Sequence, residues 1–217
     1  MTESTKISKK VIERLSEYRT ALDEQSAGEQ RNIFSHELAR LCGVTAAQVR
    51  RDLMSIGFSG SSAKGYDINE LKQTVSDFLG FGEERRVVLV GIGHLGRALL
   101  DFFVNRHPKL VVCAGFDVNE MRINRVIHGV RCYAVSEMER VVAENRAQVG
   151  IITVPESAAQ ETAERLVEAG VTGVLNFAPV QLRVPGHVFV ENLNISTVLE
   201  KVAYFAGLNA DRERVTK

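Results

Sequence analysis

The sequence predicts an α/β protein that begins with a winged helix-turn-helix domain, continues as a doubly wound parallel sheet and ends in a separate helix. Three observations support this prediction. Two short helical patterns meet at a tight turn around Gly43, strand and helix patterns alternate over residues 85–192, and a glycine-rich turn opens that alternation at Gly91. Repeated strand–helix units of this length are typical of a parallel sheet with helices on both faces.

The composition fits one large domain or two small ones, since the chain has 217 residues. Its 27 basic residues balance its 27 acidic ones, so the net charge neither favours nor excludes nucleic acid. Cys42, Cys113 and Cys132 lack metal-ligand spacing, and we expect reduced thiols and no metal. No apolar run approaches the ~18 residues of a membrane span, so we expect a soluble, cytoplasmic protein without a membrane partner.

The N-terminal domain opens with a helix over residues 8–25, where four side chains share one face: Val11, Leu15, Tyr18 and Leu22. An extended segment follows at residues 33–34. Ser35 is placed to cap a short second helix, which Gly43 ends.

A third helix opens with a capping-box pattern over residues 45–48 and ends at Gly57, and its buried stripe is Val49, Leu53 and Ile56. Helix, tight turn and capped helix form a helix-turn-helix. Four side chains off the stripe occupy positions at which a recognition helix reads DNA: Gln48, Arg50, Arg51 and Ser55. Paired arginines are also common on a solvated helix face, so the pattern alone leaves DNA binding open.

The segment over residues 58–66 is rich in glycine and serine and has one lysine, Lys64, between two aromatic residues. This is typical of a β-hairpin wing, in which Lys64 would contact a DNA phosphate. Residues 1–66 hold ten Lys and Arg against eight Asp and Glu, a weak excess. An amphipathic helix over residues 68–80 completes this domain, which we place at residues 1–80.

An apolar strand over residues 87–90 runs directly into the motif Gly91-Ile-Gly93-His-Leu-Gly96. Gly91 permits the tight turn, Gly93 lets backbone N–H groups approach a pyrophosphate, and Gly96 lets the next helix pack close to the strand. That helix points its unpaired N–H groups and positive end at the anion. We therefore expect a Rossmann dinucleotide-binding domain, with cofactor contacts from the three glycines and from the residues between them, Ile92, His94 and Leu95.

The next strand ends in Asp117, about 20 residues after Gly96, where an acidic residue holds the ribose 2′-hydroxyl. A carboxylate here would repel a 2′-phosphate, so we expect NAD(H) rather than NADP(H). The alternative is a glycine turn in an ordinary α/β domain with a coincidental aspartate.

We place the Rossmann domain at residues 85–192. Its later strands are expected at 130–133, 149–153, 171–175 and 188–190, with helices at 136–146, opened by a capping box at Ser136, and at 157–169. Loops after these strands lie at the carboxyl edge, where such sheets bind ligands. Thr153, Pro155, Asn176 and Pro179 are therefore candidates to line a nicotinamide pocket, although Asn and Pro are also ordinary turn residues.

Residues 193–217 are expected to form a helix that starts near Asn194 and has an apolar face: Val198, Leu199, Val202, Phe205 and Ala206. Because helices already cover both faces of the sheet, this helix would most naturally pack on a second subunit and form a homodimer. Packing on its own chain is the alternative. Ile195 is a further candidate contact to the cofactor.

Two functional classes fit these observations. One is an NAD-dependent oxidoreductase, but no substrate domain follows the Rossmann domain, and no tyrosine is followed four residues later by a lysine. The other is a ligand-controlled DNA-binding protein, with a DNA-binding domain followed by a dinucleotide sensor.

Along almost its whole length the chain resembles the Rex family of redox-sensing transcriptional repressors. Six stretches support the resemblance: Val49-Arg-Arg-Asp-Leu53, Lys64-Gly-Tyr66, Val90 to Leu99, Thr153-Val-Pro155, Arg165 to Gly170 and Asn176 to Val180. It implies a non-catalytic homodimer with a swapped C-terminal helix, which represses respiratory and fermentative genes and leaves double-stranded operator DNA when NADH binds. It assigns two sets of residues, Gly91, Gly93, Gly96 and Asp117 to the cofactor and Arg50, Arg51 and Lys64 to the operator.

Three positions depart from the family pattern. The family usually has an arginine where this chain has Thr20, a tyrosine where it has Phe102, and an aspartate where it has Asn194. In the family that aspartate pairs with the arginine in one state and with the tyrosine in the other. We therefore expect a lost or altered NADH-driven release, unless a substitute network through Arg19 does the same work.

Overall fold

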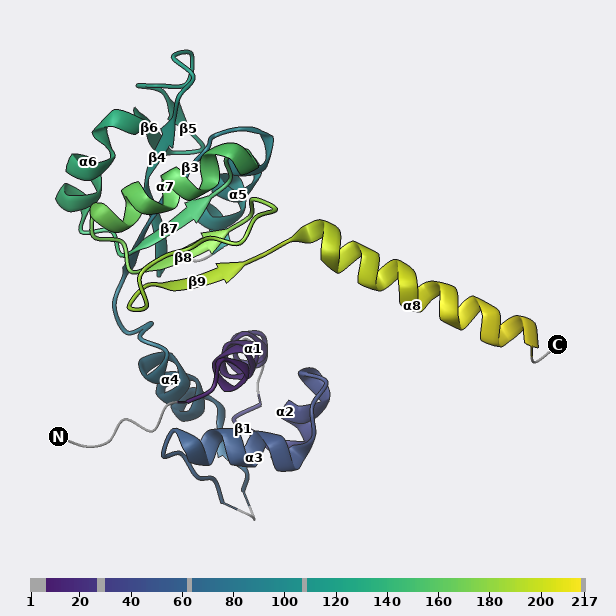
Figure 1. Cartoon of the computed structure of the whole chain (residues 1–217). Coiled ribbons are helices and arrows are strands. Elements are labelled where there is room, and N and C mark those ends of the chain that lie inside the picture. Colours follow the sequence, from purple (N-terminus) through teal and green to yellow (C-terminus); the bar gives the residue numbers. More distant parts are fainter. Residues whose placement is uncertain (1–6, 27–29, 62–63, 107–108, 216–217) are drawn as a thin grey trace. The chain divides into compact units, whose positions relative to one another are not determined.

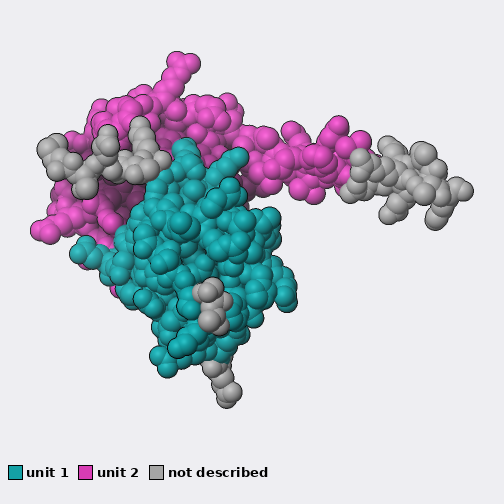
Figure 2. All heavy atoms as spheres, turned by 90° about the horizontal axis from the view of Figure 1, so that it is seen from below, with its two compact units in different colours: residues 1–83 teal, residues 84–217 magenta. Residues whose placement is uncertain are grey.

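The computed structural model describes residues 7–26, 30–61, 64–106 and 109–215. The chain divides into two compact units, residues 1–83 and residues 84–217, which Figure 2 shows in different colours. Each unit has its own hydrophobic core.

The first unit combines helices with a short two-stranded sheet (Figure 1): α1 (Lys9–Gln25), β1 (Asn32–Ile33), α2 (Ser35–Leu41), α3 (Ala46–Ser55), β2 (Tyr66–Asp67) and α4 (Ile68–Phe78). Strands β1 and β2 pair antiparallel. Leu15, Tyr18 and Leu22 of α1 are fully buried against Val49 and Leu53 of α3. The apolar face predicted for the first helix is thus confirmed at three of its positions, while Val11 is only partly buried.

The start of α2 differs from the prediction. Ser35 is the first helical residue, and Phe34 precedes the helix in an extended conformation. The Phe34 N–H donates to the Glu37 carboxylate, with 2.7 Å between the two heavy atoms. A glutamate one turn into the helix, rather than a serine hydroxyl, therefore satisfies the exposed backbone at this end.

The capping box predicted at the start of α3 is half formed. The Thr45 hydroxyl accepts a hydrogen bond from the Gln48 N–H at 3.2 Å, as expected of an N-cap. The Gln48 side chain does not return to Thr45 but donates to Asp52. Gly57 follows the helix with a φ of 78°, a left-handed conformation that favours glycine.

The predicted wing is smaller than a regular hairpin. Ser61 and Gly65 form an isolated bridge and exchange backbone hydrogen bonds of 3.0 and 2.8 Å. The following residues belong to β2, which pairs with β1 rather than with the wing. Residues 62–63, at the tip of the predicted hairpin, lie outside the described residues.

The second unit contains a seven-stranded sheet in the order β5-β6-β4-β3-β7-β8-β9. All neighbouring strands are parallel except β5 and β6, so the predicted doubly wound sheet is confirmed. Strand β5 was not predicted, because two residues are too few to show a periodicity. The bounds are β3 (Arg85–Val90), β4 (Leu110–Asp117), β5 (Val126–Ile127), β6 (Val130–Ala134), β7 (Val149–Ile152), β8 (Gly173–Asn176) and β9 (Phe189–Asn192).

Three helices cover this sheet (Figure 1): α5 (His94–Arg106), α6 (Met138–Asn145) and α7 (Glu156–Glu168). Val88 and Val90 of β3 pack in one core with α6 and α7. Val87 and Leu89 pack in another core, with Leu100 of α5. Because both faces of β3 are buried from Val87 onward, residues 87–90 form a continuous apolar run rather than an alternating one.

In α5, Leu100 is fully buried in the same core as β3, whereas Phe102 is 42% exposed. Helix α6 starts later than expected, because Ser136 lies within a 3₁₀ turn that precedes it.

The last helix, α8 (Ile195–Val215), begins where the sequence predicts, because the Asn194 side-chain oxygen accepts from the Thr197 N–H at 3.2 Å. Every side chain described along it, over residues 195–208, is exposed. The exposed set includes large apolar residues: Ile195, Val198, Leu199, Val202, Tyr204, Phe205 and Leu208. Within the described part of the chain, none of the helices has the length and apolar character that crossing a membrane would require.

Candidate functional site: a nucleotide pocket and a recognition helix

A pocket of about 640 Å³ lies at the carboxyl ends of β3, β4 and β7. Strands β4 and β7 flank β3, and the chain winds outward from this point in both directions. Open α/β sheets bind ligands at such a switch point. The pocket is lined by residues from the strand ends and from α7, among them Gly91, Gly93, Asp117, Thr153, Glu161 and Arg165.

The three motif glycines differ in what surrounds them. Gly91 has a φ of 97°, and a Cβ there would lie 2.8 Å from the Thr153 carbonyl oxygen. A Cβ at Gly96 would overlap the Gly91 carbonyl oxygen. Gly93 lines the pocket, and a Cβ there would meet no atom within 4 Å. Open space before the Gly93 backbone, at the start of α5, fits the pyrophosphate of a dinucleotide.

Asp117, at the end of β4, is 5% exposed and accepts three hydrogen bonds. Its Oδ2 accepts from the Ile92 N–H at 2.7 Å and from Arg122 Nη1 at 2.9 Å, and its Oδ1 accepts from the Asn119 N–H at 2.8 Å. Burial by itself would raise the pKa of Asp117, but the hydrogen bonds from Asn119, Arg122 and Ile92 outweigh it and hold that pKa below its usual value. The carboxylate is therefore ionised at neutral pH.

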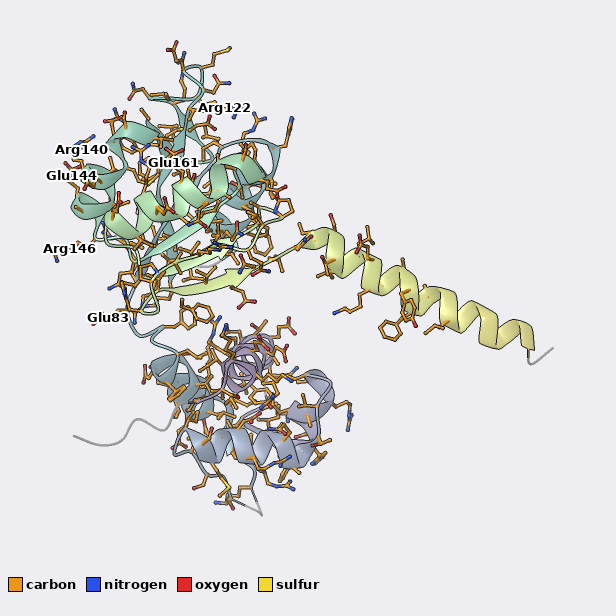
Figure 3. The ribbon with its side chains drawn as sticks, viewed as in Figure 1. Glu83, Arg122, Arg140, Glu144, Arg146 and Glu161 are labelled. Atoms are coloured by element: carbon orange, nitrogen blue, oxygen red, sulfur yellow. The ribbon has the colours of Figure 1, made fainter. Side chains whose placement is uncertain are left out.

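Arg122, labelled in Figure 3, was not predicted from the sequence; it follows β4 and lines the same pocket. Its guanidinium forms an ion pair with Asp117 and is one-third exposed. The available signal was a cation five residues after the aspartate that is expected to bind the ribose, in a segment of turns. Arg122 offsets part of the negative charge on which the expected rejection of a 2′-phosphate depends.

The predicted nicotinamide residues separate into two pairs. Thr153 and Pro155 line the pocket, and the Thr153 hydroxyl donates to the Gly91 carbonyl at 2.7 Å. Asn176 is fully buried, with its amide nitrogen bonded to the carbonyls of its own loop and to Asn192, and it does not line this pocket. Pro179 is exposed and lies outside the pocket lining as well. Asn176 therefore stabilises a turn through its side-chain hydrogen bonds, which was the alternative to a place in the nicotinamide pocket.

The remaining residues predicted to contact the cofactor differ in burial and in position relative to the pocket. Ile92 packs its side chain into the core and contributes its N–H to Asp117. His94 and Leu95 are exposed at the start of α5. Gly96 is buried under the turn, and Ile195 is 55% exposed on α8 and absent from the pocket lining.

The predicted recognition helix, α3, exposes Arg50, Arg51 and Ser55, whereas Gln48 is half-buried. Arg50 Nη1 donates to the Ser35 hydroxyl at 3.0 Å. Met54 is 69% exposed among these polar side chains, but it was not predicted as a surface residue of this helix. Its position off the apolar stripe indicated that it would be exposed. Lys64 is exposed beside the isolated bridge of the wing.

Behind this surface lies Asp52, a buried carboxylate that sequence analysis also missed. It accepts from Arg14 Nε at 2.6 Å, Arg14 Nη2 at 2.8 Å, the Tyr18 hydroxyl at 2.8 Å and Gln48 Nε2 at 2.7 Å. Burial by itself would raise the pKa of Asp52, but the hydrogen bonds from Arg14, Tyr18 and Gln48 hold that pKa below its usual value. Asp52 thus fixes α3 to α1.

The three positions that depart from the family pattern have local partners. The Thr20 hydroxyl donates to a carbonyl of its own helix, the Phe102 ring meets that of Phe103 edge-on, and Asn194 caps α8. Arg19 lies with its guanidinium 4.6 Å from the centre of the Phe81 ring. Within the described residues, no group of three or more His, Cys, Asp or Glu side chains is placed to hold a metal ion.

Two family models match separate parts of the chain. The model described as "CoA binding domain" matches residues 82–180, and the model described as "Putative DNA-binding protein N-terminus" matches residues 6–53. Along the chain, the match to the DNA-binding model therefore comes first and the match to the CoA-binding model comes second.

Curated relatives match far more of the chain. A redox-sensing transcriptional repressor Rex from Syntrophobacter fumaroxidans is 39% identical over 205 residues, covering 92% of this chain and 95% of the relative. One from Natranaerobius thermophilus is 37% identical over 196 residues, covering 90% of each chain.

Solved structures agree with these relatives. The crystal structure of RSP, a Rex-family repressor, has a TM-score of 0.85 and 32% identity, covering 99% of this chain and 100% of RSP. RSP in complex with β-NAD⁺ and operator DNA has a TM-score of 0.88 at 32% identity, covering 98% of each chain. With identities above 30% over at least nine-tenths of its length, the chain belongs to the Rex family of redox-sensing transcriptional repressors.

Proposed function

We propose that this chain is a redox-sensing transcriptional repressor that binds double-stranded operator DNA as a homodimer and takes NAD(H) as its ligand. The observation that supports this most directly is the joint presence of two sites on one chain. One is the pocket formed by Gly91, Gly93 and Asp117, and the other is the exposed arginine pair on α3. RSP, a relative matched over at least 98% of both chains, has been crystallised with β-NAD⁺ and operator DNA and with β-NADH.

In this proposal the pocket holds the dinucleotide by its backbone and by Asp117. The N–H groups near Gly93 and the start of α5 meet the pyrophosphate, and Asp117 has lone-pair capacity left for an adenosine ribose hydroxyl. Thr153 and Pro155 line the same pocket. In this proposal the protein is a cytoplasmic regulator and not a catalyst. The bound dinucleotide would act as a signal through its oxidised or reduced form and would not be consumed.

Helix α3 is the proposed recognition helix, with Arg50, Arg51 and Ser55 toward the major groove and Lys64 of the wing on a phosphate. Arginine pairs bidentately with guanine, and a lysine on a phosphate adds affinity without sequence preference. Arg50, Arg51 and Lys64 are exposed cations of the helix-turn-helix and its wing.

Homodimer formation is proposed from the apolar surface of α8. Val198, Leu199, Val202, Phe205 and Leu208 are each between 40% and 64% exposed, which leaves a large apolar face in water. Such a face marks an association site. A helix of a second copy or its Rossmann domain would cover this surface.

The test is a titration of the purified protein with NADH and NAD⁺, followed by nicotinamide fluorescence and calorimetry, beside a binding assay on a duplex selected from a randomised library. We expect saturable binding of both ligands, a two-fold symmetric selected site and no NADH consumption with small carbonyl acceptors. Steady NADH turnover, or failure to select any duplex, would contradict the proposal.

A further inference from the structure

The side chain of Gln48, counted by sequence among the DNA-reading residues, has both ends of its amide engaged within the protein. Its Nε2 donates to Asp52 Oδ1 at 2.7 Å, and its Oε1 accepts from Arg51 Nη2 at 3.0 Å. A glutamine that reads adenine must offer both its amide oxygen and its amide nitrogen to the base edge. In this arrangement both the amide nitrogen and the amide oxygen of Gln48 already have a hydrogen-bond partner within the protein, so neither is free for a base in the DNA major groove.

The orientation of this amide is fixed from behind. Asp52 is 2% exposed and can only accept hydrogen bonds, so the amide nitrogen of Gln48 must face it and the amide oxygen must face outward. Arg14 and Tyr18 of α1 hold the Asp52 carboxylate in place. The outward oxygen then meets the guanidinium of Arg51, which is exposed.

Resting on the proposed DNA binding, we propose that Gln48 is a positioning residue for Arg51 and not itself a reader of a base. An arginine that is free in water must give up rotamer freedom when it binds a guanine edge. One donor of the Arg51 guanidinium is already held by Gln48, and the other N–H groups stay available for a bidentate contact. Gln48 thereby sharpens the discrimination that Arg51 supplies.

The experiment compares base preference in three variants on the duplex that the parent protein selects from a randomised library. Arg51→Ala identifies the base pair that Arg51 reads. Gln48→Met keeps the length and helix propensity of the side chain but removes both amide hydrogen bonds. We expect Gln48→Met to lose preference at the same base pair, from about tenfold or more in the parent to below threefold. The double variant should lose no more preference than Arg51→Ala alone.

The matched control is Gln73→Met on α4. Gln73 Nε2 donates to Asp77 Oδ1 at 2.7 Å with the same spacing of four residues, but Gln73 lies outside the proposed DNA surface. It should leave every base preference unchanged, and thermal unfolding of both glutamine variants checks that each remains folded.

Two outcomes would overturn the inference. Loss of preference at a different base pair in Gln48→Met would mean that Gln48 reads a base directly. Unchanged preference in Gln48→Met, while Arg51→Ala loses it, would mean that Arg51 needs no support. Failure of the parent to select any duplex would instead overturn the proposed DNA-binding function, so the two failures are distinguishable.

Discussion

Arg122 lies against Asp117 inside the nucleotide pocket, with Nη1 2.9 Å from Oδ2. Asp117 alone would place an uncompensated negative charge beside the adenosine ribose. The ion pair removes much of that charge, and Arg165 of α7 also lines the pocket. We therefore expect selection between NAD(H) and NADP(H) to depend on this pair rather than on the aspartate alone.

We predict that Arg122→Gln strengthens the rejection of NADPH. A cation near the ribose attracts a 2′-phosphate, so its removal should weaken NADPH binding more than NADH binding, by roughly tenfold or ~1.4 kcal/mol. Nicotinamide fluorescence titrations with both ligands measure the ratio. Arg125→Gln, in the same segment but absent from the pocket lining, is the control. An unchanged ratio in Arg122→Gln would show that Arg122 has no part in selectivity.

The buried cluster around Asp52 predicts an acid dependence of stability. Its pKa is lower in the folded than in the unfolded chain, so its stabilisation is complete above the unfolded pKa of about 3.9 and is lost as the pH falls through the folded value. Asp52→Asn should lower the free energy of unfolding at pH 7 by about 3 kcal/mol, because Arg14 loses its counter-charge. It should also flatten the loss of stability as the pH falls below about 4.

Urea unfolding followed by circular dichroism at pH 7 and at pH 3.5 tests this. Asp77→Asn replaces an exposed carboxylate of α4 and should change stability by less than about 0.5 kcal/mol. Equal stability of the parent and Asp52→Asn at pH 7 would be inconsistent with a stabilising cluster.

Arg51 and Lys64 should contribute to operator binding in different ways. Arg51→Ala should lose ~1–3 kcal/mol of discrimination at one base pair. Lys64→Ala should bind all duplexes more weakly and reduce the slope of log affinity against log salt by about one. Equilibrium binding of matched and mutated duplexes at several salt concentrations distinguishes the two. If both variants bind as the parent does, α3 and its wing are not the DNA-binding surface.

The changed positions predict a weak response to NADH. Thr20 and Asn194 carry no charge and Phe102 has no hydroxyl, so the exchange of partners described for the family cannot form in its usual way. Loss of those contacts would remove ~1.5–3 kcal/mol of difference between the two states. Operator affinity measured with saturating NADH and with saturating NAD⁺ should then differ by less than about fivefold. A release of about a hundredfold by NADH alone would show that a substitute network operates.

Arg19 is the residue to examine if release is strong. Its guanidinium lies over the Phe81 ring, and its side chain is within 3.5 Å of Asp23. Arg19→Lys would keep the charge but weaken the stacking on Phe81. A drop in NADH-driven release in this variant, with unchanged NADH affinity, would identify Arg19 as part of the substitute network.

The sequence by itself determined the glycine turn and, apart from the short strands β2 and β5, the order of the elements. Residues 87–90 of β3 are all apolar because they are buried on both faces of the sheet, and Gly91 and Gly96 are required by close backbone approaches, so both features leave a local signature. The end of β4 at Asp117 and the start of α8 after Asn194 are likewise local features, and both were predicted correctly.

Only the tertiary structure decided which polar side chains face the pocket and which satisfy the protein's own backbone. Asn176 turned inward to bond its own loop, Arg122 joined Asp117, and Asp52 joined Arg14 across 38 positions of the chain. Hydrogen-bond partners of this kind are chosen by distance and direction in space. Residue type and spacing along the chain fix neither, because a carboxylate accepts equally well from any donor that the fold brings within reach.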